Sequence, residues 1–324
     1  MSGLFPARKF VTAIDPAGPP PELGGAVAAI GNFDGIHRGH RVVIARARAL
    51  ASKLKLPCAV LTFEPHPADF FRGPNTIFRL TPLDAKAKAL ERLGIDGVIV
   101  LTFDQSLAGL PAADFVATVL VGRLGIRAAV AGYDFHFGAG RLGTPAFLKE
   151  EGERHGIAVE IVDCVPAGPG DSCAAASSTA ARAALEAGDA RLAARLLGHP
   201  FSIMGKVTHG EERGRTLGFP TANILPHPSC RLRHGVYAVR ASINSIRYDG
   251  VANYGRRPTF DNGRALLEVF LFGFAGNLYG ETLEVDFAFW IRPETKFGSA
   301  GELIAQMKLD ETRAKELLKA SAAG

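Results

Sequence analysis

The chain has 324 residues, 47% of them hydrophobic and 21% charged, which is the composition of a folded globular protein with room for two domains. The net charge of +5 is scattered without a basic run, which favours anionic small molecules over nucleic acid as ligands. The four cysteines form no CxxC pair, so we expect reduced thiols and no zinc site. The N-terminus lacks a continuous apolar segment and no apolar run approaches the ~20 residues of a membrane span, so we expect no signal peptide and a cytoplasmic protein.

The first half of the chain alternates short apolar strands with helices. Strands are predicted at residues 26–30, 58–63, 96–103, 127–132 and 157–163, and helices at about 39–54, 82–93, 112–124 and 145–155. Apolar strands separated by helices predict a parallel sheet that is covered on both faces. Such sheets bind ligands at the carboxyl ends of their strands.

Two short helices are predicted after a loop rich in Gly, Pro, Ser and Ala that follows residue 163. Their expected boundaries are Ser177, Ser178 or Thr179 and Gly188 for the first helix, and Asp189 and Gly198 for the second. We place the domain junction in this helical pair, with domains at residues 1–186 and 187–324.

The second half contains strands predicted at residues 235–243, 245–253, 265–272 and 282–291. Turn signals at residues 244–245, 249–250 and 262–263 separate them, which indicates a compact antiparallel barrel. A helix from about residue 299 to 320 closes the chain.

The segment GNFDGIHRGH, residues 31–40, directly follows the first predicted strand. Its glycines allow a tight turn and a close approach of backbone to ligand. His37 and His40 lie three residues apart at a helix start, so both can face one point. The helix N-terminus adds N–H donors that stabilise a phosphate during transfer. From the residues alone, two surface histidines are an equal alternative.

This segment resembles the nucleotidylyltransferase signature in its FAD synthetase form, as do TFEPHP (residues 62–67), GYDFHFGAGRLGT (132–144) and SSTAAR (177–182). The resemblance implies ATP-phosphate contacts for His37 and His40, loop-shaping and nucleotide-binding roles for Asn32, Asp34 and Gly35, pyrophosphate contacts for Ser178, Thr179 and Arg182, and flavin contacts for Asp134 and Phe135. Core packing is the alternative for Phe135. The chain departs from the family pattern at His136, Ala176 and Ala181, which keeps open a protein that has only the activity of the second half.

The segment GKVTHGEERGRTLGFPTANI, residues 205–224, offers a Gly-rich backbone and the cations Lys206, Arg213 and Arg215 to an anion. Thr221 and Asn223 present a hydroxyl and a carboxamide oxygen two residues apart, which are hard ligands suited to Mg²⁺. A loop with an Asn-containing turn is the alternative. The segment resembles the riboflavin kinase signature, which implies nucleotide contacts for Gly205, Lys206, Thr221 and Asn223, and Mg²⁺ contacts for the last two.

Glu268 lies in a predicted strand on the same face as Leu266 and Phe270. A carboxylate there is costly unless it is used or paired, and a structural ion pair with an Arg is the alternative to a general base. The kinase resemblance implies that Glu268 takes the proton of the riboflavin 5′-hydroxyl. VANYGRRPTF, residues 251–260, also resembles the family and implies a flap, with flavin contacts from Asn253 and Arg256 and with Arg256 or Arg257 near phosphate.

From about residue 26 to 318, the order of motifs resembles the bifunctional prokaryotic riboflavin kinase/FAD synthetase family. The resemblance implies an N-terminal Rossmann-like nucleotidylyltransferase domain with a parallel sheet and a small C-terminal antiparallel β-barrel with a C-terminal helix. It implies that the chain phosphorylates riboflavin to FMN and adenylylates FMN to FAD, with ATP as co-substrate and Mg²⁺ as cofactor. The alternatives are riboflavin kinase alone, a non-enzymatic flavin-binding protein and a tRNA-binding protein. We expect no nucleic-acid or membrane partner, and a weak homo-oligomer stays open.

Overall fold

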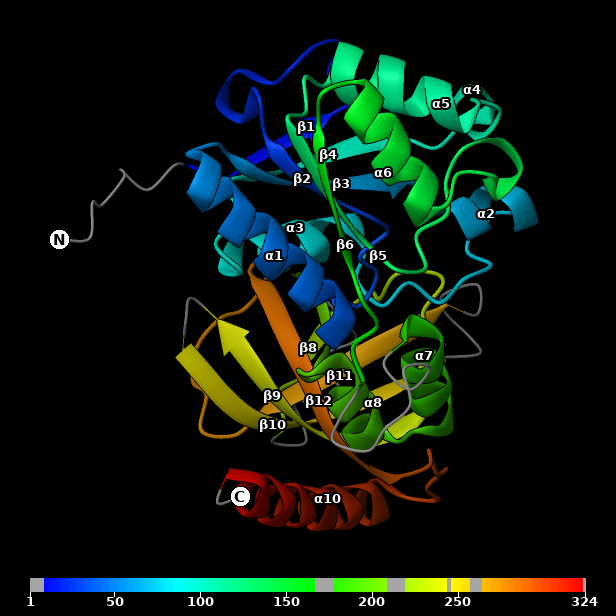
Figure 1. Ribbon diagram of the computed structural model, residues 1–324. Helices are drawn as coiled ribbons and strands as arrows, with labels where there is room; N and C mark the ends of the chain where they lie inside the picture. Colours follow the sequence, from blue (N-terminus) through cyan, green and yellow to red (C-terminus); the bar gives the residue numbers. More distant parts are fainter. Residues whose placement is uncertain (1–8, 167–176, 209–218, 244–245, 257–263, 323–324) are drawn as a thin grey trace, which may run out of the picture. The chain divides into compact units, whose positions relative to one another are not determined.

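The computed structural model describes residues 9–166, 177–208, 219–243, 246–256 and 264–322, in two compact units (Figure 1). The first unit comprises Met1–Ile77 and Thr81–Ala176, and the second comprises Phe78–Leu80 and Ser177–Gly324. Both junction helices therefore belong to the second unit. The boundary at residue 186 stays a prediction of where the first function ends.

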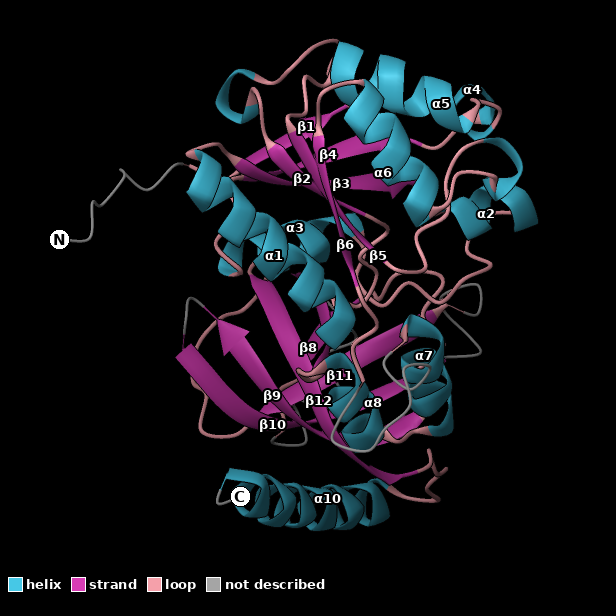
Figure 2. Ribbon diagram, in the orientation of Figure 1, coloured by secondary structure: helices cyan, strands magenta, loops and turns pink. Residues whose placement is uncertain are grey.

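The first unit is a six-stranded sheet with the strand order β1-β4-β3-β2-β5-β6, in which all the strand pairs are parallel (Figure 2). Its strands are β1 (Val11–Ile14), β2 (Val27–Ile30), β3 (Cys58–Glu64), β4 (Gly97–Thr102), β5 (Ala128–Gly132) and β6 (Ala158–Val162). Its helical segments are η1 (Pro21–Leu23), α1 (Arg38–Leu54), α2 (Pro67–Arg72), α3 (Leu83–Arg92), α4 (Gln105–Ala108), α5 (Ala112–Asp114), η2 (Phe115–Arg123), η3 (Ala139–Arg141) and α6 (Pro145–Arg154). The predicted parallel α/β fold is confirmed. The sequence analysis did not predict β1, α2 or α4.

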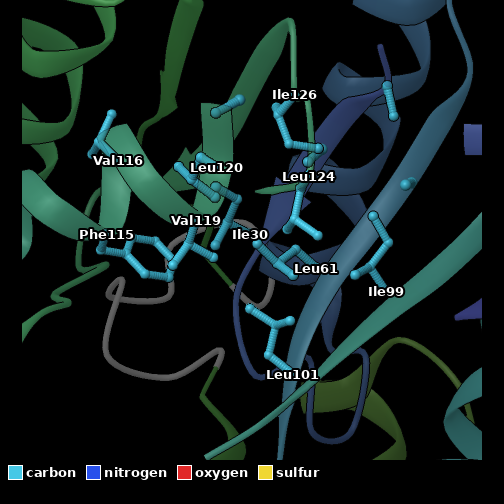
Figure 3. Close-up of a cluster of buried hydrophobic side chains, with 14 of the residues drawn as sticks. Ile30, Leu61, Ile99, Leu101, Phe115, Val116, Val119, Leu120, Leu124 and Ile126 are labelled. Atoms are coloured by element: carbon cyan, nitrogen blue, oxygen red, sulfur yellow. The ribbon is translucent and has the colours of Figure 1, made fainter. Parts of the chain in front are cut away.

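Alternate residues of the central strands face two separate cores, as strand geometry requires. Ile30, Leu61 and Ile99 belong to one core, which also contains buried side chains of η2 and which Figure 3 shows. Val27 and Val60 face the other core, into which α1 buries residues three or four positions apart. Strands that bury both faces are largely apolar, which is why the sequence reveals them so clearly.

The second unit is a closed barrel with the strand order β10-β11-β8-β7-β12-β9 (Figure 1). Its strands are β7 (Phe201–Thr208), β8 (Ala222–Ile224), β9 (Gly235–Ile243), β10 (Ile246–Arg256), β11 (Ala265–Leu271) and β12 (Thr282–Arg292), and its helices are α7 (Ser178–Ala187), α8 (Ala190–Leu197) and α10 (Ala300–Ala322). All strand pairs are antiparallel, which confirms the predicted barrel and its C-terminal helix. The sequence analysis did not predict β7 and β8 as strands.

Side chains on the two sides of the barrel wall have different partners. Tyr237 and Phe287 are fully buried and their rings lie 5.1 Å apart. On the outer side, Val236 and Val251 pack with Leu318 of α10. The C-terminal helix thus covers one outer face of the barrel, the face that also carries Phe270.

Two further observations bear on the sequence-based expectations. Cys164 is disulfide-bonded, so the expectation of reduced thiols is wrong at this position, whereas Cys58 and Cys230 are free. Within the described ranges, none of the helices combines the length and the apolar character that crossing a bilayer requires.

Candidate functional site

The GNFDGIHRGH segment forms the turn between β2 and α1. Phe33, Gly35 and Ile36 have φ angles of 48°, 83° and 40°, in the left-handed region that costs a residue with a Cβ atom free energy. Phe33 and Ile36 compensate by burying their side chains in the core of the first unit. The turn is therefore fixed by its surroundings rather than by local preference.

Asp34 holds this turn from inside the protein. Its buried carboxylate accepts a hydrogen bond from the backbone N–H of Thr81 at 2.9 Å, and the Thr81 hydroxyl accepts one from the N–H of Gly35. On the other side of Phe33, the carbonyl of Asn32 accepts a hydrogen bond from the Thr62 hydroxyl at 3.1 Å. These contacts place Asn32, Asp34 and Gly35 in the frame of the turn.

The two histidines lie together at the N-terminus of α1. His37 is the N-cap residue, and its Nδ1 accepts a hydrogen bond from the backbone N–H of His40 at 3.3 Å. The two half-buried rings stack with centroids 3.6 Å apart, and the Phe33 ring lies 5.1 Å from that of His40. A helix N-terminus with two imidazoles can receive an anion such as a phosphate.

The loop after β5 carries the predicted flavin-side residues. Asp134 is exposed, and its carbonyl lies 2.9 Å from Nδ1 of His136. Phe135 is half-buried, stacks on Phe137 at a centroid distance of 5.3 Å and packs against the core around η2. The core-packing alternative for Phe135 thus has direct support, and its remaining exposed surface is what a flavin could contact.

The SSTAAR segment begins α7 in the second unit. Ser177 caps the helix by accepting a hydrogen bond from the N–H of Ala180 at 3.2 Å, while Ser178 and Thr179 follow in the first turn. Arg182 is half-buried, and its Nε donates to the carbonyl of Phe78 at 2.7 Å. These residues belong to the second unit, and their role in nucleotide binding is part of the proposal below.

Strand pairing places the predicted kinase residues in a row. Asn253 of β10 lies opposite Glu268 of β11, and Glu268 lies opposite Asn223 of β8. Directly opposite residues share a face of the sheet and have Cβ atoms about 5 Å apart. Thr221 precedes β8 and stands two residues from Asn223, so it continues the same face. The barrel therefore brings together side chains that are up to 47 positions apart in the sequence.

Two oxygens of this row suit a ligand. Oδ1 of Asn223 and Oδ1 of Asn253 are buried, and neither has a hydrogen-bond partner in the part of the chain that the structure describes. An amide oxygen left in this state costs about 1–3 kcal/mol, which a metal ion or substrate donor would offset. The Asn223 oxygen and the Thr221 hydroxyl, two residues apart along the chain, are the kind of hard oxygen donors that fit Mg²⁺.

Glu294 is a neighbour of the row that sequence reasoning missed. Its Oε1 accepts a hydrogen bond from Nδ2 of Asn253 at 3.3 Å, and its Oε2 lies 3.9 Å from Nδ1 of His234. The bond orients the Asn253 carboxamide, because it fixes which end is the nitrogen. A contact between residues 41 positions apart leaves no signal in a single sequence.

The remaining predicted kinase residues lie on the flanking strands. Gly205 of β7 has a packing role, because a Cβ there would lie 2.6 Å from Cγ2 of Ile224. Lys206 is exposed opposite Thr282, and Arg256 is exposed at the end of β10. The candidates Arg213, Arg215 and Arg257 lie outside the described residues.

Comparisons with known proteins cover nearly the whole chain. The family model of FAD synthetase matches residues 20–174, and that of riboflavin kinase matches residues 197–318. A "bifunctional riboflavin kinase/FMN adenylyltransferase" of Haemophilus influenzae is 43% identical over 90% of this chain and 94% of its own length. Proteins with the same description from Escherichia coli K12 and Bacillus subtilis are 41% and 37% identical, each over 90% of this chain and 92% of the relative.

Among solved structures, one described as a macrolide-efflux protein from Streptococcus pneumoniae superposes with a TM-score of 0.80 at 32% identity. The match covers 94% of this chain and 99% of that one. The similarity covers both units, and the name macrolide-efflux protein is that of the Streptococcus pneumoniae chain.

Proposed function

Because this chain belongs to the family of bifunctional riboflavin kinase/FMN adenylyltransferases, we propose which of its residues carry each of the two reactions. The chain is an enzyme of flavin cofactor biosynthesis that phosphorylates riboflavin to FMN and adenylylates FMN to FAD, using ATP in both steps. The observation that carries this conclusion is the presence of both family models, in this order, in one chain.

In adenylyl transfer, a phosphate oxygen of FMN attacks the α-phosphorus of ATP, and the bond to the bridging oxygen of the β-phosphate breaks to release pyrophosphate. We assign the phosphate contacts to His37 and His40, whose stacked rings stand at a helix N-terminus. The supporting residues of this proposal are Asn32, Asp34 and Gly35 for the turn, Ser178, Thr179 and Arg182 for the departing pyrophosphate, and Asp134 and Phe135 for the flavin. In this proposal the adenylyltransferase domain spans residues 1–186, a boundary chosen by function that falls within α7.

In the kinase reaction, the 5′-hydroxyl oxygen of riboflavin attacks the γ-phosphorus of ATP and ADP leaves. We propose that Glu268 is the general base that accepts the proton of that hydroxyl, since it is paired with Asn253 on one adjacent strand and with Asn223 on the other. Thr221 and Asn223 would hold Mg²⁺, which neutralises phosphate charge when it is bound. The supporting residues are Gly205 and Lys206 for the nucleotide, and Asn253 and Arg256 for the flavin. This domain spans residues 187–324.

The setting of the enzyme is part of the proposal. Substrates of this kind favour a cytoplasmic enzyme with no nucleic-acid or membrane partner. A weak homo-oligomer is a further proposal, and sedimentation of the purified chain over a range of concentrations tests it.

Chromatography of the products formed from riboflavin, ATP and Mg²⁺ tests both assignments in one protein. We expect the wild-type chain to make FMN and then FAD, whereas His40→Ala should accumulate FMN. Glu268→Gln should convert added FMN to FAD but leave riboflavin unphosphorylated. If the wild-type chain phosphorylates riboflavin yet forms neither FAD nor pyrophosphate from FMN, the first assignment fails and the kinase-only alternative holds.

A further inference from the structure

A buried lysine of the first unit is connected, through hydrogen bonds, to the turn between β2 and α1. Lys86 lies in the first turn of α3, and its side chain is 1% exposed. Its Nζ lies 3.1 Å from Oε1 of Glu64 and donates a hydrogen bond to Oγ1 of Thr62 at 3.2 Å. An ammonium group in such a place is costly unless it is paired and hydrogen-bonded, and the end of β3 supplies both partners.

The charge of Lys86 determines the direction of the next hydrogen bond. An ammonium group only donates, so the Thr62 oxygen accepts from it and directs its own proton elsewhere. That proton goes to the carbonyl of Asn32, at 3.1 Å. Because the C=O and N–H of a trans peptide point in opposite directions, this bond also turns the N–H of Phe33 away from β3.

The same segment of chain anchors the turn at a second point. Thr81, just before α3, binds the carboxylate of Asp34 and the N–H of Gly35. The two anchors stand on either side of Phe33, whose φ of 48° is unfavourable without support. The start of α3 therefore holds the turn where its backbone is most prone to relax.

We propose that Lys86 and Thr62 are positioning residues for adenylyl transfer. Through the Asn32–Phe33 peptide, their relay fixes the direction of the donors and imidazoles that receive the ATP phosphates. Donors that are already oriented before the reaction stabilise the charge that develops on the phosphate, so a small displacement of the turn slows the chemical step. Lys86 acts through Thr62 and not on the substrate. The inference rests on the proposed function of the first unit.

Thr62→Val is the deciding variant, because it deletes the relay hydroxyl while the Lys86–Glu64 pair remains. We expect the kcat of FAD formation from FMN to fall at least tenfold, with the KM for ATP within threefold of the wild-type value. A loss confined to kcat marks an interaction that matters in the transition state. Thr62→Ser, which restores the hydroxyl, should return kcat to within threefold. Riboflavin phosphorylation by the same preparations should be unchanged.

Lys86→Met has a matched control in Lys88→Met, two residues along the same helix and exposed. We expect the first to lose at least as much adenylylation as Thr62→Val and the second to lose none. If Lys86→Met does not fold, the Thr62 pair decides the question.

A folded Thr62→Val protein with kcat within threefold of the wild type would overturn the inference. Equal losses in Thr62→Val and Thr62→Ser would also overturn it. A wild-type chain that makes no FAD would instead overturn the proposed function itself.

Discussion

Replacing Glu268 by Gln separates chemistry from structure in the kinase reaction. The carboxamide has nearly the size of the carboxylate and takes its place between Asn253 and Asn223, so the strand pairing persists. It cannot accept the proton of the 5′-hydroxyl, and general-base catalysis typically contributes about 10²–10⁴-fold. Neither opposite carboxamide takes up a proton near neutral pH, so neither replaces the lost base. We therefore expect kcat to fall by about 10³-fold or more, or roughly 4 kcal/mol of transition-state stabilisation.

The assay follows riboflavin to FMN by chromatography over quenched time points. FAD formation from added FMN by the same preparation is the internal control and should be unchanged. Glu316→Gln, on the exposed face of α10, is the matched control for removing a carboxylate. A kcat within tenfold of the wild-type value, or an equal loss of FAD formation, would refute the assignment of Glu268 as the base.

Three further outcomes follow from single groups. Asn223→Leu removes a buried oxygen that has no hydrogen-bond partner among the described residues, so the Mg²⁺ concentration for half-maximal riboflavin phosphorylation should rise at least tenfold; an unchanged Mg²⁺ titration would contradict the ligand role. Arg292→Met leaves the buried carboxylate of Asp310 without a guanidinium at 2.7 Å, and urea unfolding should show a loss of about 3–5 kcal/mol. Burial, and then the charge of Asp96, raises the pKa of Cys58 to about 12, so iodoacetamide should alkylate it at pH 8 about 1000-fold more slowly than an unperturbed cysteine; equal rates in folded and urea-unfolded protein, read by mass spectrometry, would contradict this.

Local signals made the junction helices predictable. Ser177 caps α7 and Gly188 ends it in the left-handed region, as Asp189 and Gly198 do for α8. Each of these contacts joins residues a few positions apart, so a single sequence contains the whole motif.

The missed strands depend on distant partners instead. β8 has three residues and becomes a strand because β11 and β7 pair with it on either side. β1 is a four-residue edge strand with alternating half-buried and exposed residues, and among the described strands it pairs with β4 alone. Pairing of this kind overrides local preference and leaves no trace within the segment itself.

The residues of the candidate sites also divide into those that a local motif reveals and those that depend on distant contacts. Family motifs named His37, His40, Asn223 and Glu268 from the sequence, because those segments are contiguous. Lys86 escaped notice because a lysine in an amphipathic helix is ordinarily solvated. Only the fold reveals that the partners of this lysine are at the end of β3, more than twenty positions earlier in the chain.

Register has a direct consequence for how the kinase site can fail. Side chains alternate between the two faces of a strand, so a slip of one residue between β11 and its neighbours would move Glu268 to the opposite face of the barrel wall. Val269 and Leu267, which flank Glu268, are fully buried on that opposite face. Their burial opposes the slip, because it would expose two apolar side chains and place a carboxylate among the apolar residues of the interior. Substitutions that weaken the packing of Val269 or Leu267 should therefore lower kcat for riboflavin phosphorylation, although neither residue belongs to the row that receives the substrate.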